Sequence, residues 1–197
     1  FKEAAITAAQ KLNENNQEII ARHGNSLDTG TQPGFNRKIQ QALIPAFLST
    51  YGGYGLDSKT LALFPVLSMI RPNWRVNYDG LIDIPIVGEY AQSVNLTHAY
   101  VATYNVGSYT TNSKYDTRVD YSYVRDRNTG FYVPQFDVGS VSITEQFSPL
   151  IGVDVTLKNN ITARAEYKKN RSLMLGTSNY SLIESYGKEY VFGAGYR

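Results

Sequence analysis

The sequence predicts a mainly β fold with long antiparallel strands, preceded by a helical and irregular segment. Apolar and polar residues alternate over residues 138–157 and again over 161–171, and a period of two places the two sets on opposite faces of a sheet. Tyr and Gly each occur 16 times; Tyr suits strands and interfacial belts, and Gly suits turns and bulges. A hydrophobic content of 42% and a mean hydropathy of −0.32 are too polar for a helical membrane protein.

The N-terminal part of the chain is predicted to be helical and irregular. Residues 1–23 are rich in Ala, Lys, Glu and Gln and carry a weak apolar stripe, which favours a helix. A loop rich in Gly, Asn, Thr and Pro follows at 24–36. A short helix is expected at 37–50, kinked or interrupted near Pro45. Residues 56–72 are apolar and irregular, so we expect them to pack against another part of the molecule.

Strands are predicted for most of the remaining chain. Alternation at 73–80 and at 94–107 predicts two strands, and a polar stretch at 108–137 predicts a long loop. After the hairpin described next, a turn is expected near 186–188, and 189–197 is expected to begin another strand.

The phase of the alternation fixes the register of the central hairpin. A three-residue loop at 158–160 opposes Leu157 to Ile161 and Asp154 to Arg164, so apolar side chains meet on one face and opposite charges on the other. Asn at the left-handed position of such a loop is physically reasonable.

On the apolar face of this hairpin, the residue types change with distance from the turn. Its aliphatic residues lie near the turn, Phe147 and Tyr167 come next, and Glu145 lies diagonal to Arg171 beyond them. The phase continues through Pro149, which indicates a bulge or kink within one strand. This order is typical of a membrane β-barrel, with an apolar band, an aromatic level and a wall in water. A long two-faced hairpin in a soluble β protein accounts for the periodicity equally well.

Residues for catalysis or metal binding are scarce. The chain has no Cys, and its two His are His23, at a predicted helix C-terminus, and His98, which we expect to be packed or interfacial. Pairs such as Asp79 and Asp83 are better explained by loop solvation. We therefore expect no enzyme activity, no cofactor and no metal. Charges are interspersed at a net charge of +2, so nucleic acid is not an expected partner.

Several strings of the sequence resemble one family. They are Ile-Pro-Ala-Phe-Leu at 44–48, Pro-Asn-Trp-Arg-Val-Asn-Tyr-Asp-Gly at 72–80, Ser-Ile-Thr-Glu-Gln-Phe-Ser-Pro-Leu-Ile-Gly at 142–152, Leu-Lys-Asn-Asn-Ile-Thr-Ala-Arg at 157–164 and Glu-Tyr-Lys-Lys-Asn-Arg-Ser-Leu at 166–173. They resemble the SprA/Sov family, the outer-membrane translocon of the type IX secretion system. The string around Phe147 is the most specific. The resemblance spans essentially the whole chain and matches a late C-terminal stretch of a far longer protein, so we expect both ends to be internal.

The resemblance implies a fragment of a very large antiparallel transmembrane β-barrel in the outer membrane of a Gram-negative bacterium, partly exposed at the cell surface. Folded cargo proteins, including gliding-motility adhesins, would cross through its lumen. The implied partners are membrane lipid, secreted cargo, a plug protein and a companion outer-membrane barrel. Residues 1–72 would form a cap or in-barrel insertion, and 73–197 a segment of barrel wall with the loop at 108–137.

In this interpretation the two phases of the hairpin face different surroundings. The expected lumen-facing residues are Asp154, Thr156, Arg164, Glu166 and Lys168. The expected lipid-facing residues are Val153, Val155, Leu157, Ile161, Ala163 and Ala165, with Phe147 and Tyr167 as interfacial aromatics. A nutrient-uptake receptor or porin-type barrel, and a soluble β-rich surface or adhesin module, are the alternatives.

Overall fold

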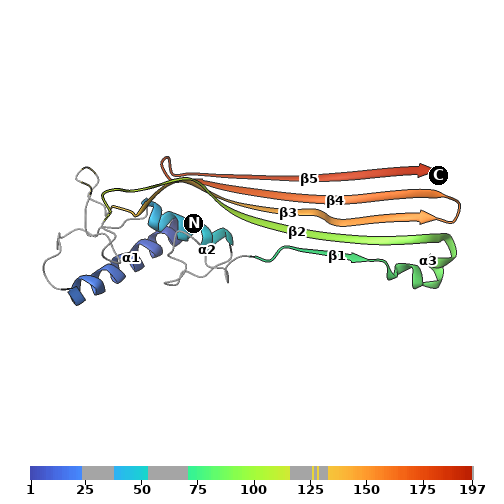
Figure 1. The fold of residues 1–197 in the computed structure, drawn as a ribbon, viewed down its shortest axis with the longest axis horizontal. Helices are drawn as coiled ribbons and strands as arrows, with labels where there is room; N and C mark the ends of the chain where they lie inside the picture. The colour runs from blue at the N-terminus through green and yellow to red at the C-terminus, as the bar shows by residue number, and fades with distance from the viewer. Residues whose placement is uncertain (24–37, 53–70, 116–125, 127, 129–132, 197) are drawn as a thin grey trace. The chain divides into compact units, whose positions relative to one another are not determined.

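A computed structural model of the chain describes residues 1–23, 38–52, 71–115, 126, 128 and 133–196. The strands are β1 Trp74–Tyr78, β2 Ala91–Thr111, β3 Phe136–Leu157, β4 Ile161–Gly176 and β5 Ser181–Tyr196. They form one sheet in the order β1-β2-β3-β4-β5 (Figure 1). The predicted mainly β fold with long antiparallel strands is confirmed. The described sheet is open, with β1 and β5 at its edges, and does not close into a barrel.

The two predicted N-terminal helices are present, and two further short helices were not predicted. They are α1 Lys2–His23, α2 Gln40–Gly52, the 3-10 helix η2 Gly80–Asp83 and α3 Pro85–Tyr90. The predicted interruption of the second helix is wrong, because α2 runs on through Pro45. Ile44, Pro45 and Phe47 are fully buried, and this packing offsets the hydrogen bond that proline removes from a helix. The predicted loop at 24–36 and most of the apolar stretch at 56–72 lie outside the described residues.

The chain divides into two compact units, and four of the strands contribute residues to both. The first unit holds residues 1–70, 105–142 and 174–182, and the second holds 71–104, 143–173 and 183–197. The N-terminal helices therefore share a unit with terminal stretches of β2, β3, β4 and β5.

Small residues allow the two N-terminal helices of the first unit to pack closely. Ala8 and Ala9 of α1 form a buried cluster with Ala42 of α2, and the partly buried Leu12 and Ile39 pack against it. Ala has no side chain beyond Cβ, so the helix backbones can approach each other at this point.

Side-chain hydrogen bonds join α2 and the end of β4 to β3. Gln40 accepts a hydrogen bond from the Val138 backbone N–H at 2.8 Å, and its amide donates to the Phe136 carbonyl. The Thr177 hydroxyl donates to the carbonyls of Val138 and Gly139, the latter at 3.1 Å. These polar groups hydrogen-bond to backbone groups at the start of β3.

The hairpin of the second unit has the predicted register. β3 ends at Leu157 and β4 begins at Ile161, so the loop has the three residues expected. The Asn160 N–H donates to the Leu157 carbonyl at 3.1 Å, and Asn160 has a φ of 64°. β3 also continues through Pro149, as predicted.

The left-handed conformation of Asn160 gives a first testable prediction. We expect Asn160→Val to destabilise the hairpin by about 1–2 kcal/mol, because a β-branched residue meets a steric penalty at positive φ. Asn160→Gly should be tolerated, since glycine adopts this conformation freely. Urea unfolding of the protein measures both variants. Equal midpoints for the two would contradict this account of the turn.

Two predicted boundaries are wrong. Strand pairing extends into the predicted loop at 108–137, because β2 continues to Thr111 and the Asn112 N–H donates to the Gln135 carbonyl at 2.9 Å. The predicted turn at 186–188 lies within β5, and the chain turns at 177–180 instead.

Gly187 lies within β5, beside Asn170 of β4, and not in a turn. A Cβ atom there would lie 2.5 Å from Oδ1 of Asn170. The actual turn holds Tyr180 at a φ of 55°, and the Asn179 side chain accepts hydrogen bonds from the Ser181 N–H and hydroxyl.

Candidate functional site

Charged side chains on one face of the second unit form a connected series of ion pairs. We call Asp154, Arg164, Glu166, Lys168 and Glu189 the charge ladder. Arg164 lies 3.6 Å from Asp154, as the register predicts, and its Nε donates to Glu166 at 3.0 Å. Lys168 lies 3.6 Å from Glu166 and 3.3 Å from Glu189. The ladder therefore alternates in sign from β3 across β4 to β5.

The ladder contains most of the residues predicted to face a lumen. Asp154, Arg164, Glu166 and Lys168 are brought together, and Thr156, which shares their phase, is half-buried. Sequence reasoning missed Glu189, because the misplaced turn at 186–188 hid its pairing with β4. The Asp154–Arg164 pair is exposed, and such pairs contribute little to stability, about 0–1 kcal/mol each. Glu166 differs, because only 9% of its side chain is exposed between Arg164 and Lys168.

The opposite face near the 158–160 turn is aliphatic. Val153, Val155, Ala163 and Ala165, all predicted lipid-facing residues, surround one hollow with Phe192 and Ala194 of β5. Leu157 is half-buried and Ile161 is exposed at the end of this surface. We call these eight residues the aliphatic band.

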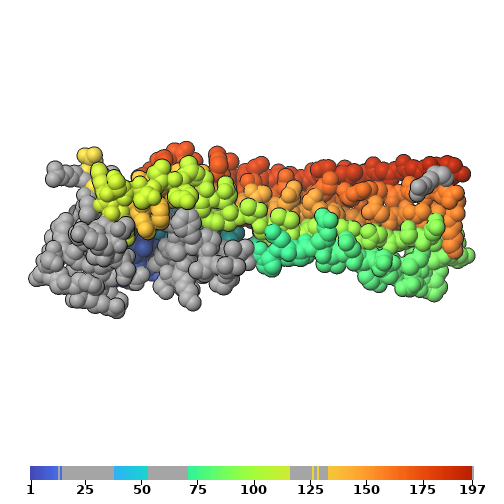
Figure 2. All heavy atoms as spheres, in the orientation of Figure 1, coloured from blue at the N-terminus to red at the C-terminus, as the bar shows by residue number. Residues whose placement is uncertain are grey.

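Neither face of the hairpin is covered in the described part of the chain. On the aliphatic side, 79% of Phe192 is exposed, and on the charged side 57% of the Arg164 side chain is exposed. Figure 2 shows one face of the second unit, where β4 and β5 (orange to red) lie at the surface with no other described segment over them. In the described residues, this single layer with one apolar and one charged face is therefore open on both sides.

Aromatic rings follow the aliphatic band on the same face. Trp74 of β1 stacks on Tyr100 of β2 at 4.4 Å between ring centroids, and Tyr100 lies 4.8 Å from Phe147 of β3. Tyr167 of β4 stacks on Tyr190 of β5 at 4.8 Å with an interplanar angle of 13°. We call these five residues the aromatic level. The two predicted interfacial aromatics, Phe147 and Tyr167, both belong to it.

His98 is packed, as predicted, rather than placed for chemistry. Its ring centroid lies 5.9 Å from that of Phe147 and 6.3 Å from that of Trp74, and its Nδ1 is 2.6 Å from the Leu150 carbonyl oxygen. The side chain of His23 lies outside the described part of the structure.

An ionic cluster adjoins Phe147 and Tyr100 of the aromatic level. Glu145 accepts a hydrogen bond from the Tyr100 hydroxyl at 2.9 Å, pairs with Arg71 and lies 3.6 Å from Arg171. Arg171 in turn donates to Glu184 at 2.8 Å. The predicted diagonal contact between Glu145 and Arg171 is confirmed. Arg71 was missed, because it lies outside any regular strand and its sequence distance to Glu145 carries no pairing signal.

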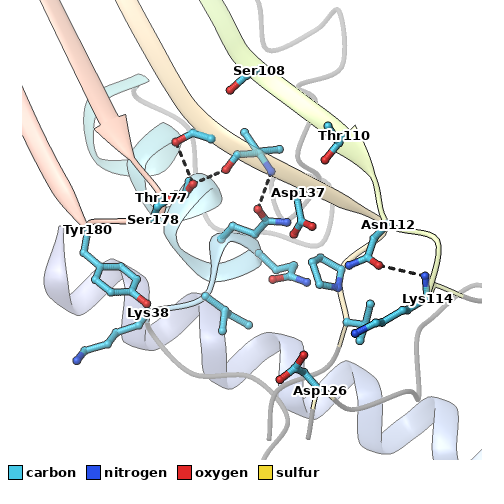
Figure 3. A pocket seen from close by; sticks show the side chains of 17 residues that line it. Lys38, Ser108, Thr110, Asn112, Lys114, Asp126, Asp137, Thr177, Ser178 and Tyr180 are labelled. Carbon is cyan, nitrogen blue, oxygen red and sulfur yellow. Dashed lines mark hydrogen bonds between the residues drawn. The ribbon is translucent and has the colours of Figure 1, made fainter. Parts of the chain in front are cut away.

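A pocket in the first unit is lined by polar and apolar residues and is crossed by structural hydrogen bonds (Figure 3). Lys38, Asp126 and Asp137 are among its lining residues, and the Thr177 hydroxyl within it is bonded to β3 carbonyls. Lys38 also lies over the ring of Tyr180, 5.8 Å from its centroid. The hydrogen bonds in this pocket join α2 and the turn after β4 to β3.

Other chemical features of the described residues are limited. They contain no group of three or more His, Cys, Asp or Glu side chains that could hold a metal ion. No helix among them is long and apolar enough to cross a membrane. Burial raises the pKa of the Tyr104 phenol far above its ordinary value, so this tyrosine stays protonated at physiological pH.

No protein-family model matches the chain, and no curated protein matches it.

Proposed function

We propose that the chain is part of the wall of an outer-membrane translocon, through which folded cargo proteins cross the outer membrane of a Gram-negative bacterium. The resemblance to the SprA/Sov family suggests this role. The observation that carries it is the uncovered two-faced sheet, with the aliphatic band on one face and the charge ladder on the other.

The aliphatic band and the aromatic level support a lipid-facing surface. Exposed apolar side chains this close together mark a surface that meets another apolar phase. In membrane barrels such a band is flanked by aromatic residues at the level of the headgroups. Tyr167 and Tyr190 occupy that place on β4 and β5, and Phe147 occupies it on β3. The ionic cluster then lies in water beyond the bilayer.

The charge ladder supports a wet inner surface suited to passage. Its three acidic and two basic residues are joined by ion pairs, so the surface is hydrophilic but close to neutral. A wall of this kind attracts neither acidic nor basic cargo strongly, because each charge is compensated by its neighbour. It would therefore let cargo proteins of different charge pass without holding them.

The open edge of β5 supports a longer sheet in the complete protein. An exposed edge strand presents unpaired backbone groups and is a site for pairing with another strand. Further strands beside β5 would satisfy these groups and extend the wall. A plug protein, a companion barrel and a partly surface-exposed location remain part of this proposal through the resemblance.

Photo-crosslinking during secretion tests the proposed function. A photoreactive amino acid at Thr162, on the charged face of β4, should form adducts with secreted proteins in living cells. The same group at the neighbouring Ala163, on the aliphatic face, should form none with cargo. Cargo adducts at both positions or at neither would contradict the assignment of the charged face to a transport path.

A further inference from the structure

Two lysines lie directly opposite each other on β4 and β5. Tyr167 stacks on Tyr190, and Lys168 lies 3.3 Å from Glu189, so the next pair in this antiparallel register is Lys169 with Lys188. Because side chains alternate between faces, both lysines share the face of the two tyrosines.

These two lysines have no anionic partner among the described residues. Both are exposed, whereas Lys168 on the other face contacts both Glu166 and Glu189. The carboxylate nearest along this face of β5, Glu184, is bonded to Arg171. Like charges directly opposite each other destabilise a sheet. An anion from outside the chain that bridges the two ammonium groups would remove this repulsion.

The position of the lysine pair indicates which anion it would meet. The pair lies one step beyond the Tyr167–Tyr190 stack, on the side away from the aliphatic band, and before Arg171. Interfacial tyrosines lie at the level of the headgroups, so groups one step further out meet the lipid phosphates.

We propose that Lys169 and Lys188 bind the phosphate group of a membrane lipid, in the leaflet opposite the 158–160 turn. This inference rests on the proposed function, because it requires the aliphatic band to face lipid. Two ammonium groups on neighbouring strands can both donate to one phosphate. Such charge-assisted hydrogen bonds are stronger than those between neutral groups. The site would hold a lipid against the wall beside the free edge of β5.

Amine footprinting of the full-length protein in lipid nanodiscs tests this site. One set of discs contains only digalactosyldiacylglycerol, which is uncharged and lacks phosphate, and the other also contains phosphatidylglycerol. A water-soluble acylating reagent modifies lysines, and mass spectrometry measures the rate at each one. We expect phosphatidylglycerol to slow modification of Lys169 and Lys188 about fivefold, since each lysine near a headgroup contributes about that factor in affinity. The rate at Lys168, at the same height on the other face, should not change.

The outcomes separate this inference from the proposed function. Equal rates at Lys169 and Lys188 in both lipids would overturn the headgroup site, as would equal protection by inorganic phosphate added to phosphate-free discs. A cysteine at Val155, probed in the same discs with a lipid-partitioning reagent, reports separately on the membrane wall. Reaction at Val155 without lysine protection overturns only the headgroup site, and no reaction at Val155 overturns the wall itself.

Discussion

Val155→Arg is expected to abolish most assembly of the full-length protein into the outer membrane. Val155 lies in the aliphatic band beside Val153 and Ala163. An arginine on the lipid face near the bilayer midplane costs about 2–4 kcal/mol, a large fraction of the net stability of a typical folded protein. The amount of folded, heat-modifiable protein in purified outer membranes measures the effect.

Thr156→Arg is the matched control for this substitution. Thr156 is the next residue of β3 and shares the face of the charge ladder, where Asp154 lies two residues away. The new guanidinium would stay in water and meet a nearby carboxylate, so we expect near-normal assembly. Equal loss, or equal assembly, of the two variants would mean that the faces are not distinguished by lipid and water.

Glu145→Gln is expected to destabilise the second unit by about 2 kcal/mol, the scale of a hydrogen bond to a charged group. Only 14% of the Glu145 side chain is exposed, and it contacts Arg71, Arg171 and Tyr100. Glutamine keeps the shape but removes the charge, so two arginines would then face each other without the carboxylate between them. The shift in the urea midpoint of the full-length protein in detergent measures the loss.

Glu184→Gln provides the comparison for Glu145. Within the described cluster Glu184 pairs with Arg171, and 43% of its side chain is exposed. Exposed pairs contribute about 0–1 kcal/mol, so its removal should shift the midpoint less. A larger shift for Glu184→Gln than for Glu145→Gln would show that Glu145 is not the centre of this cluster.

The hairpin could be predicted from the sequence because two independent signals agreed on its register. The alternation of apolar residues predicted that Leu157 lies opposite Ile161, and the charges predicted that Asp154 lies opposite Arg164. The structure has both features. The order of aliphatic, aromatic and charged residues followed from the same phase.

The start of β5 and the ionic cluster could not be predicted in the same way. Gly187 resembles a turn residue, yet it lies within β5 beside Asn170 of the neighbouring strand, a position that only the register reveals. The true turn did carry a local signal in Asn179, whose side chain bonds back to Ser181. The α3 helix was also not predicted, because it is only six residues long. Arg71 pairs with Glu145 only because the fold brings them together, and the sequence spacing between them does not predict this contact.

Cysteine labelling of the full-length protein in whole cells tests the central claim most directly. Cysteines are placed singly at Val155 and at Thr156, and each is treated with a lipid-partitioning reagent and with a small aqueous reagent. A wall between lipid and a wet lumen predicts that Val155→Cys reacts with the lipid-partitioning reagent and Thr156→Cys with the aqueous one. Reaction of both positions with the aqueous reagent alone would contradict the wall and favour a soluble β-rich module.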